Sequence, residues 1–262
     1  MNCLKTMSIL GLSIFGVSLS NIEAFAESEN ITASKTTDVR VKFIENKDAA
    51  EPINPTNPTD PDADKPIIPV NPLDPDEPVS PGTGGPLSLD FISILDFGEQ
   101  YISNKNQTYY AKPQYLRDET GQVDFDNPVP NYAQITDNRG GEKGWVLTVR
   151  QNGQFKSEKN KRDLDGAQIT FMNGEVISNS KSNAPSTVNS TISLVPDEQG
   201  ASEILMAAKN GEGFGTWIYR MGDLSSMEQS IKLDVPGSTV KEEDSYKTSL
   251  IWELKDIPEN KI

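Results

Sequence analysis

The sequence lacks histidine and contains one cysteine, Cys3, in 262 residues. Without histidine, Ser-His-Asp and Cys-His catalysis, imidazole-ligated zinc and a histidine general base are excluded. Cys3 lies in a segment that we expect to be removed, so the mature chain has no disulfide, thiol nucleophile or thiolate metal site. We therefore expect neither an enzyme nor a bound cofactor, and a fold stabilised by burial alone.

Positive charge is also scarce. The 24 Lys and Arg residues stand against 39 Asp and Glu residues, which gives a net charge of −15. Nucleic acid is an unsuitable partner, because its phosphates require clustered cations. Anionic lipid and polyanionic polymers are excluded by the same argument when charge alone would bind them. We expect any polymer ligand to be held by stacking, hydrogen bonds and shape.

Residues 1–26 have the three parts of an export signal in order. Lys5 supplies positive charge, Met7–Leu19 is apolar, and Ala24-Phe25-Ala26 fits the small-x-small cleavage pattern. The apolar run is too short to span a bilayer core of about 30 Å. A buried N-terminal helix is the alternative. We predict a signal peptide at 1–26, a secreted chain beginning at Glu27, and no membrane insertion after cleavage.

The printed sequence ends at Ile262 without a sortase-type motif or a hydrophobic tail. We expect no covalent or membrane-spanning anchor at this end. If the secreted protein stays at a surface, a folded domain is expected to hold it there.

The segment after the signal is polar and then rich in proline. Residues 27–50 contain one candidate strand, Val39–Phe43, in which apolar and charged residues alternate. Residues 51–86 form the proline-rich segment, with proline at almost every third position, the period of a polyproline II helix. We predict an extended acidic linker of up to about 110 Å. A ligand for a proline-recognition module is the alternative.

Residues 87–262 are predicted to form an all-β domain, a sandwich or partly closed barrel. Asn173-Gly174 predicts a tight hairpin turn, and Ser202–Lys209 is the one segment expected to be helical. The expected strands are Leu87–Ile94, Trp145–Gln151, Gln168–Met172, Glu175–Asn179, Thr191–Val195, Thr216–Arg220, Ser230–Val235 and Lys247–Lys255.

Two tripeptides of the same form lie in this domain, Trp145-Val146-Leu147 and Trp252-Glu253-Leu254. The segments GPLSLDF at Gly85–Phe91, LDFG at Leu95–Gly98 and GEGFGTW at Gly211–Trp217 accompany them. With a signal peptide and a proline-rich linker in front, the chain resembles the WxL family of low-GC Gram-positive surface proteins, whose domain is defined by two such motifs. The resemblance covers about residues 85–262.

The resemblance implies a protein of the cell surface that is attached non-covalently to the cell wall, with peptidoglycan as the ligand. It also implies a surface complex with other WxL proteins and a membrane-anchored WxL-interacting protein. Carried onto this sequence, the motif-matched ligand-binding residues are Trp145, Leu147, Trp252 and Leu254.

The residues themselves leave two interpretations of the motifs open. In a strand, residues two apart share a face, so Trp145 lies with Leu147, and Trp252 with Leu254. This alternation is typical of core strands, and it also suits tryptophans that frame a groove and stack on sugar rings. Trp217, after a glycine-rich stretch, is a possible additional ligand-binding aromatic or a buried one.

Three functions of different classes therefore remain. The first is a wall-binding module. The second is a structural subunit or adhesin, held by a partner protein and in contact with host matrix. The third is a wall hydrolase that uses paired carboxylates, for which the candidates are Asp90 with Asp96 and Asp124 with Asp126. Asp163-x-Asp165-Gly166 resembles the start of a calcium loop but lacks the later ligands, so we expect a surface turn and no metal site.

Overall fold

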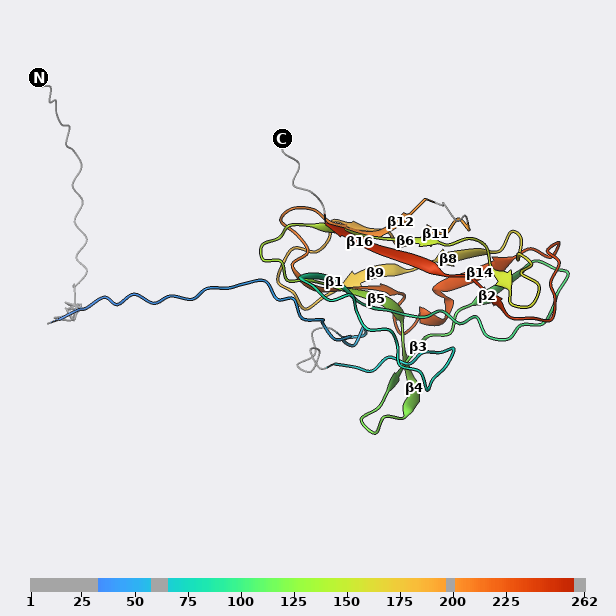
Figure 1. The fold of residues 1–262 in the computed structure, drawn as a ribbon, viewed down its shortest axis with the longest axis horizontal. Helices are drawn as coiled ribbons and strands as arrows, with labels where there is room; N and C mark the ends of the chain where they lie inside the picture. Colours follow the sequence, from blue (N-terminus) through green and yellow to red (C-terminus); the bar gives the residue numbers. More distant parts are fainter. Residues whose placement is uncertain (1–32, 58–65, 197–200, 257–262) are drawn as a thin grey trace, which may run out of the picture. The chain divides into compact units, whose positions relative to one another are not determined.

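The computed structural model describes residues 33–57, 66–196 and 201–256. The chain divides into two compact units, residues 1–42 and 43–262. Every strand that the structure describes belongs to the second unit (Figure 1). The predicted signal peptide at 1–26 lies outside the described residues, so it stays a prediction. No helix within the described ranges is long and apolar enough to cross a membrane.

The prediction of an all-β domain is confirmed. The structure describes three four-stranded and two two-stranded sheets, all with antiparallel pairing, and none of them closes into a barrel. The four-stranded sheets have the strand orders β1-β5-β13-β9, β10-β12-β6-β16 and β11-β8-β14-β2. The bounds are β1 Leu87–Ile92, β2 Gln107–Tyr110, β3 Gln114–Arg117, β4 Val123–Val129, β5 Asn131–Asp137, β6 Trp145–Gln151, β7 Lys156–Ser157, β8 Gln168–Phe171, β9 Gly174–Ile177, β10 Thr187–Val188, β11 Ile192–Ser193, β12 Glu203–Ala208, β13 Gly215–Met221, a 3-10 helix at Met227–Gln229, β14 Ile231–Val235, β15 Tyr246–Lys247 and β16 Leu250–Asp256.

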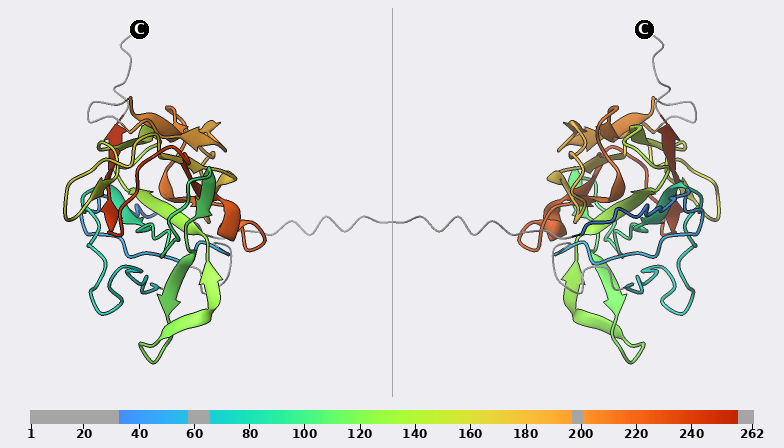
Figure 2. Two further views of the ribbon diagram at one scale, coloured as in Figure 1. Left: turned by 90° about the vertical axis from the view of Figure 1, so that its right-hand side faces the viewer. Right: turned by 90° about the vertical axis from the view of Figure 1, so that its left-hand side faces the viewer.

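The three four-stranded sheets share one hydrophobic core, to which β5, β6, β8, β13 and β14 all contribute buried side chains. Strand β14 illustrates why these segments form strands. Its residues Ile231, Leu233 and Val235 are buried, whereas Lys232 and Asp234 between them are partly exposed. Apolar residues at every second position place one face of the strand in the core. The β3–β4 hairpin stands away from this core, as both end views show (Figure 2).

The central strand β5 is buried along its whole length. Ala133 and Ile135 face the main core. On the other face, Tyr132 belongs to a second, smaller core with Ile53, Phe91 and Ile218. Ile53 is part of the proline-rich segment, so this segment supplies the cover for the second face of the sheet.

The described parts of the proline-rich segment therefore differ from the extended spacer that its period predicts. The backbone N–H of Ile53 donates to Gln134 Oε1 at 2.9 Å, and Gln134 Nε2 donates to the carbonyl of Glu51 at 2.9 Å. Ile53 is only 8% exposed. The reason is that Ile53 and its neighbours bury apolar surface and satisfy a side-chain amide inside the sheet, which outweighs the preference of proline for extended, solvated backbone.

The later half of this segment lies along the β3–β4 hairpin. The N–H of Val70 donates to the carbonyl of Tyr115, and the N–H of Arg117 donates to the carbonyl of Ile68, both at 2.9 Å. A β-bridge joins Pro69 to Leu116. Residues 68–70 thus act as a short third strand beside β3.

The helix expected at Ser202–Lys209 is wrong, because Glu203–Ala208 forms strand β12. It pairs with β6 and carries a bulge between Ile204 and Met206. Leu, Met and Ala favour helices in isolation, but pairing with the buried strand β6 and burial of Leu205 and Met206 override that preference.

The hairpin predicted at Asn173-Gly174 is also wrong. Asn173 has a φ of 53°, as a tight turn requires, but β8 and β9 on either side belong to different sheets. Gly174 begins β9 beneath the ring of Tyr219, where an added Cβ would lie 1.9 Å from the hydroxyl oxygen. The turn carries the chain from one sheet to the next, and glycine is needed there for space.

The candidate strand Val39–Phe43 is an extended segment without strand pairing. The side chains of Val39, Val41 and Phe43 are 94%, 73% and 87% exposed. The segment pairs with no strand among the described residues, so the sequence pattern is present without the element that it predicts.

Candidate functional site

The two Trp-Leu motifs lie on neighbouring strands. The first begins β6 and the second lies in β16, and these strands pair in an antiparallel register. Leu254 is opposite Leu147, Trp252 is opposite Val149, and Asp256 is opposite Trp145. Opposite residues in such a pair share a face, so both motifs direct their side chains to the same side of the sheet.

The first motif is part of the main core. Trp145 and Leu147 have no exposed surface. The indole N–H of Trp145 donates to the carbonyl of Gly213 at 2.9 Å. A Cβ on Gly213 would lie 2.6 Å from the Trp145 Nε1 atom, so the glycine is what lets the loop approach the indole. These two residues have no surface to offer a ligand directly.

Trp217 binds the same loop. It is 4% exposed, and its indole N–H donates to the carbonyl of Phe214 at 3.2 Å. The two tryptophans therefore hold consecutive carbonyls of the glycine-rich loop, Gly211–Gly215. Between them the Phe214 side chain remains 39% exposed.

Further hydrogen bonds fix the glycine-rich loop. Ser180 Oγ donates to the carbonyl of Phe214 at 2.6 Å, and Ser182 Oγ accepts from the N–H of Phe214 at 3.2 Å. Asn183 accepts from the N–H of Gly213 through its carbonyl at 2.9 Å and donates from its side chain to the carbonyl of Gly211 at 3.0 Å. A loop held at each of these backbone groups presents the Phe214 ring in one position.

Glu212 closes the base of this loop. Its carboxylate accepts from the backbone N–H groups of Ser186 at 2.9 Å and Lys209 at 3.2 Å. Burial acts to raise the pKa of Glu212, but the hydrogen bonds from Lys209 and Ser186 together outweigh it, and the pKa is lowered. The carboxylate is thus held ionised as a structural acceptor.

An ion pair lies at the start of the first motif. Arg139 forms two parallel hydrogen bonds with the buried carboxylate of Asp137, at 2.9 and 2.8 Å, and donates to the carbonyl of Gly144 at 2.6 Å. Its remaining amino group lies 3.4 Å from Asp256, at the end of β16. The guanidinium group therefore joins β5, the residue before Trp145 and the end of the second motif strand.

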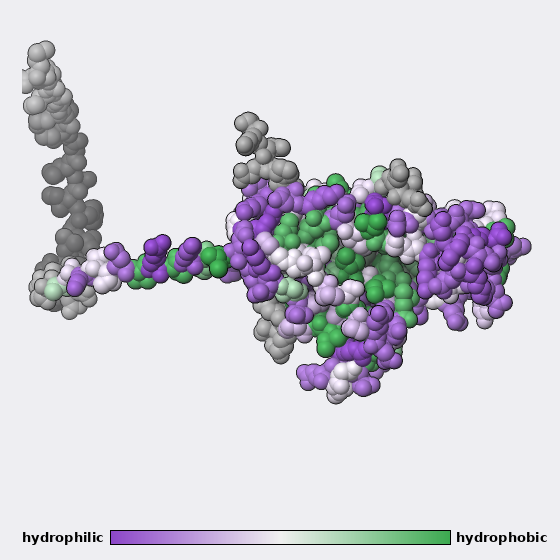
Figure 3. Space-filling view, in the orientation of Figure 1, coloured by the Kyte–Doolittle hydropathy of each residue, from purple (hydrophilic) through white to green (hydrophobic). Residues whose placement is uncertain are grey.

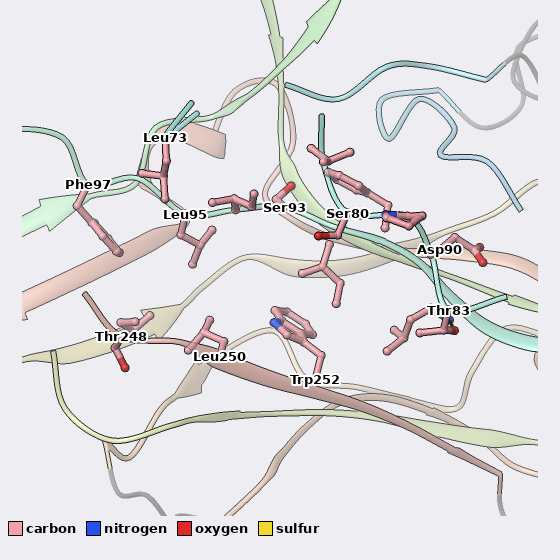
Figure 4. A pocket seen from close by; sticks show the side chains of 18 of the residues that line it. Leu73, Ser80, Thr83, Asp90, Ser93, Leu95, Phe97, Thr248, Leu250 and Trp252 are labelled. Atoms are coloured by element: carbon pink, nitrogen blue, oxygen red, sulfur yellow. Dashed lines mark hydrogen bonds between the residues drawn. The ribbon is translucent and has the colours of Figure 1, made fainter. Parts of the chain in front are cut away.

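The second motif has a different environment. Trp252 is half-buried and stacks on Phe171 of β8, with ring centroids 6.1 Å apart and planes 16° apart. It lines a groove of about 530 Å³ between β16 and the chain that runs from β1 to Phe97. Figure 4 shows Thr248, Leu250 and Trp252 along one side of this groove, with Ser93 and Leu95 across from them.

The groove is mainly apolar, and most of its polar side chains already have partners. Thr83 Oγ1 accepts from the N–H of Leu89, Ser93 Oγ accepts from the N–H of Tyr132, and Thr248 Oγ1 donates to the carbonyl of Gly153. Apolar residues gather on this face of the domain, between β16 and the β3–β4 hairpin (Figure 3). The groove therefore offers apolar contact and few free side-chain hydrogen-bonding groups.

Asp90 is the one charged residue that lines the groove. It is 2% exposed, and its carboxylate accepts from Ser88 at 2.5 Å, Thr136 at 2.6 Å and Gln134 at 3.1 Å. Burial raises its pKa, and these hydrogen bonds only partly oppose that effect. Figure 4 shows the side chain turned away from Trp252.

The other carboxylates singled out from the sequence have local partners. Asp96 pairs with Lys112 at 2.8 Å, and Asp124 accepts from the N–H of Asp126 at 3.0 Å. Asp163 pairs with Lys156 at 3.3 Å. In the part of the chain that the structure describes, no three acidic, histidine or cysteine residues are grouped as metal ligands.

A comparison with protein-family models matches residues 30–258 to the family described as WxL domain surface cell wall-binding. The chain belongs to this family. The resemblance of the two Trp-Leu motifs is thereby confirmed, and so is the location of the protein at the cell surface and wall. WxL domains bind rather than catalyse, so the match gives no support to a wall hydrolase. No curated protein and no solved structure matches the chain.

The WxL match begins before the predicted domain start at residue 87. It includes the described parts of the proline-rich segment that pack on the sheet. Of the four motif-matched residues, the structure places Trp145 and Leu147 in the core and Trp252 and Leu254 in half-buried positions. The sequence analysis missed Phe214, although its three neighbouring glycines signalled a close approach of backbone.

Proposed function

We propose that this WxL protein is retained at the cell surface by non-covalent binding to peptidoglycan, and that the glycine-rich loop carries the contact. The observation that supports this most directly is the pair of indole N–H bonds from Trp145 and Trp217 to the carbonyls of Gly213 and Phe214. They make Trp145 of the first motif, together with Trp217, a support for an exposed aromatic ring. Trp145 and Leu147 then act on binding through position rather than contact.

Phe214 has the surroundings that sugar binding requires. The apolar face of a sugar ring stacks on an aromatic side chain, and its hydroxyl and acetamido groups need polar partners nearby. The exposed side chain of Asn183 beside the loop uses one amide hydrogen on the Gly211 carbonyl and has further hydrogen-bonding capacity for such groups. Stacking and neutral hydrogen bonds also suit a chain of net charge −15, which repels the anionic polymers of the wall.

The test is a pull-down of the mature chain, residues 27–262, on peptidoglycan stripped of teichoic acid and protein. We expect retention that survives high salt, because the contact does not depend on charge. Phe214→Ala is expected to weaken retention more than about tenfold, the loss typical of a central aromatic contact. Phe125→Ala is the matched control, since Phe125 is 68% exposed on the β3–β4 hairpin.

Loss of retention in both phenylalanine variants, or in neither, would contradict the assignment of the loop. Circular dichroism and thermal unfolding of each variant show that it is folded. No retention of the folded wild-type chain would remove peptidoglycan as the ligand.

A second candidate function is a structural subunit or adhesin, held in a surface complex by other WxL proteins, by a membrane-anchored WxL-interacting protein or by host matrix. The apolar groove beside β16 favours it, because apolar surface flanked by an edge strand suits a protein partner. Strong binding to the ectodomain of the interacting protein, with poor binding to bare wall, would support it. In either case we infer that the sheets pack as a sandwich around their shared core.

A further inference from the structure

The outer edge of β16 is open along the groove. In its sheet β16 is the last strand, and the only strand with which the structure records pairing is β6. Every second residue of an edge strand directs its N–H and C=O outward, where another strand can bind them. The second Trp-Leu motif thus lies on a strand with one free side.

The facing strand β1 is also an edge strand, but its edge is protected. Thr83 donates its N–H to the carbonyl of Leu89 at 2.8 Å, and its hydroxyl accepts from the N–H of Leu89 at 3.0 Å. Gly82 makes this approach possible, since a Cβ there would lie 2.8 Å from the carbonyl oxygen of Asp90. Of the two strands beside the groove, β16 is therefore the one that can accept a new neighbour.

Every second residue from Thr248 to Trp252 of β16 directs its side chain into the groove. Thr248, Leu250 and Trp252 are two residues apart and face the groove together. A strand added to β16 would direct every second side chain to the same side, into the groove. Main-chain hydrogen bonds would supply affinity, and the apolar groove would select apolar residues at alternate positions.

A sugar suits this groove less well. Thr83, Asp90, Ser93 and Thr248 already have hydrogen-bond partners, and the other two side chains with a polar group are Ser80 and Trp252. A sugar ring needs several polar side chains for its hydroxyl groups. The free hydrogen-bonding capacity beside this groove is the backbone of β16, which matches a peptide strand.

This chain contains a segment with the required chemistry. Val39, Val41 and Phe43 are apolar, alternate with Arg40 and Lys42, and are exposed. We propose that Val39–Phe43 of one copy adds to the free edge of β16 in a second copy, with its apolar side chains in the groove at Trp252. The proposal goes beyond wall binding, because it makes the protein self-associating.

Charge does not select this pairing. When Val39, Val41 and Phe43 face the groove, Arg40 and Lys42 face the opposite side of the sheet. On that side β16 carries Glu253 and Lys255, which already form an ion pair with each other at 2.9 Å. The apolar side chains and the free main-chain groups of β16 therefore carry the contact.

The contact is of the head-to-tail kind, because a donor segment of one copy meets an acceptor edge of the next. We therefore expect the mature chain to form dimers and longer assemblies as its concentration rises in sedimentation equilibrium. The variant Val41→Asp with Phe43→Asp is expected to be monomeric and as stable as wild type. Arg40→Ser with Lys42→Ser, on the opposite face, is the matched control and is expected to retain most association.

A second measurement leaves the groove and the edge of β16 unchanged. A synthetic peptide of residues 36–46, which contains no tryptophan, is titrated into the Val41→Asp, Phe43→Asp chain. We expect a saturable blue shift of tryptophan emission, since Trp252 is half-buried whereas Trp145 and Trp217 are buried. A peptide with serine at positions 39, 41 and 43 is expected to bind at least about tenfold more weakly.

Each remaining outcome overturns the proposal. A monomeric wild type whose double variant still binds the peptide means that the groove is not filled by a second copy. If the peptide causes no shift of tryptophan emission, the segment Val39–Phe43 does not occupy the groove. A shift with a disaccharide fragment of peptidoglycan, and none with the peptide, assigns the groove to a glycan. Phe214→Ala is expected to leave association unchanged, so failure here is distinct from failure of wall binding.

Discussion

Leu147 of the first motif lies directly opposite Leu254 of the second, on paired antiparallel strands. The two motifs, more than a hundred residues apart in the sequence, therefore form one continuous structure in the sheet. The tryptophans of the two motifs have different roles. Trp145 supports the glycine-rich loop from inside the core, and Trp252 lines an open groove.

Trp145→Phe is expected to destabilise the fold and loosen the glycine-rich loop. Phenylalanine keeps most of the ring but leaves the buried carbonyl of Gly213 without its donor, which costs about 1–3 kcal/mol. Chemical denaturation measures the loss, and hydrogen exchange at residues 211–215 reports the loop. Trp252→Phe is the control and is expected to cost less than about 1 kcal/mol. Equal effects of the two changes would contradict the division of roles.

Leu147→Ala is expected to cost about 2–5 kcal/mol, because it leaves a cavity at a fully buried position. Leu254→Ala, directly opposite but half-buried, is expected to cost less than half as much, because its site can relax toward solvent. Urea denaturation of both variants gives the comparison. A larger loss for Leu254 would show that the second motif, rather than the first, is the core element.

The sequence predicted the strands with clear alternation well, and β6 was placed at its observed bounds. It missed β5, although β5 is the most buried strand, because a strand covered on both faces shows no alternation. Leu205 and Met206 were assigned to a helix by their propensity, which pairing with β6 overrides. The motif tryptophans were identified, but a fold-level contact such as Trp145 with Gly213, 68 residues away, cannot be obtained from spacing.

Ile53→Ala tests whether the proline-rich segment is part of the folded domain. Ile53 packs in the second core with Tyr132 and Phe91, so the change is expected to lower the free energy of unfolding by about 2–3 kcal/mol. Val39→Ala, at an exposed position of the extended segment, is expected to change it by less than about 0.5 kcal/mol. Unchanged stability of Ile53→Ala would show that the proline-rich segment is a free linker.

Asp90 makes stability depend on pH in a defined direction. Burial raises the folded pKa of Asp90 above its ordinary value, so the native state binds more protons than the unfolded state between the two pKa values. Between these two pKa values, ionisation of Asp90 lowers the free energy of unfolding as the pH rises. Asp90→Asn lacks this titration, so the wild type is expected to gain stability relative to the variant as pH falls from 7 toward 4. Thermal unfolding of both proteins across that range measures the difference in stability. A difference that does not change with pH would contradict a raised pKa of Asp90.

The central claim, that Phe214 on the glycine-rich loop contacts peptidoglycan, is tested most directly by titration calorimetry with soluble peptidoglycan fragments. The mature wild type and Phe214→Tyr, which keeps the aromatic face, are expected to bind, and Phe214→Ala is expected to bind more than about tenfold more weakly. Unchanged affinity of a folded Phe214→Ala chain would show that the wall is bound elsewhere on the domain.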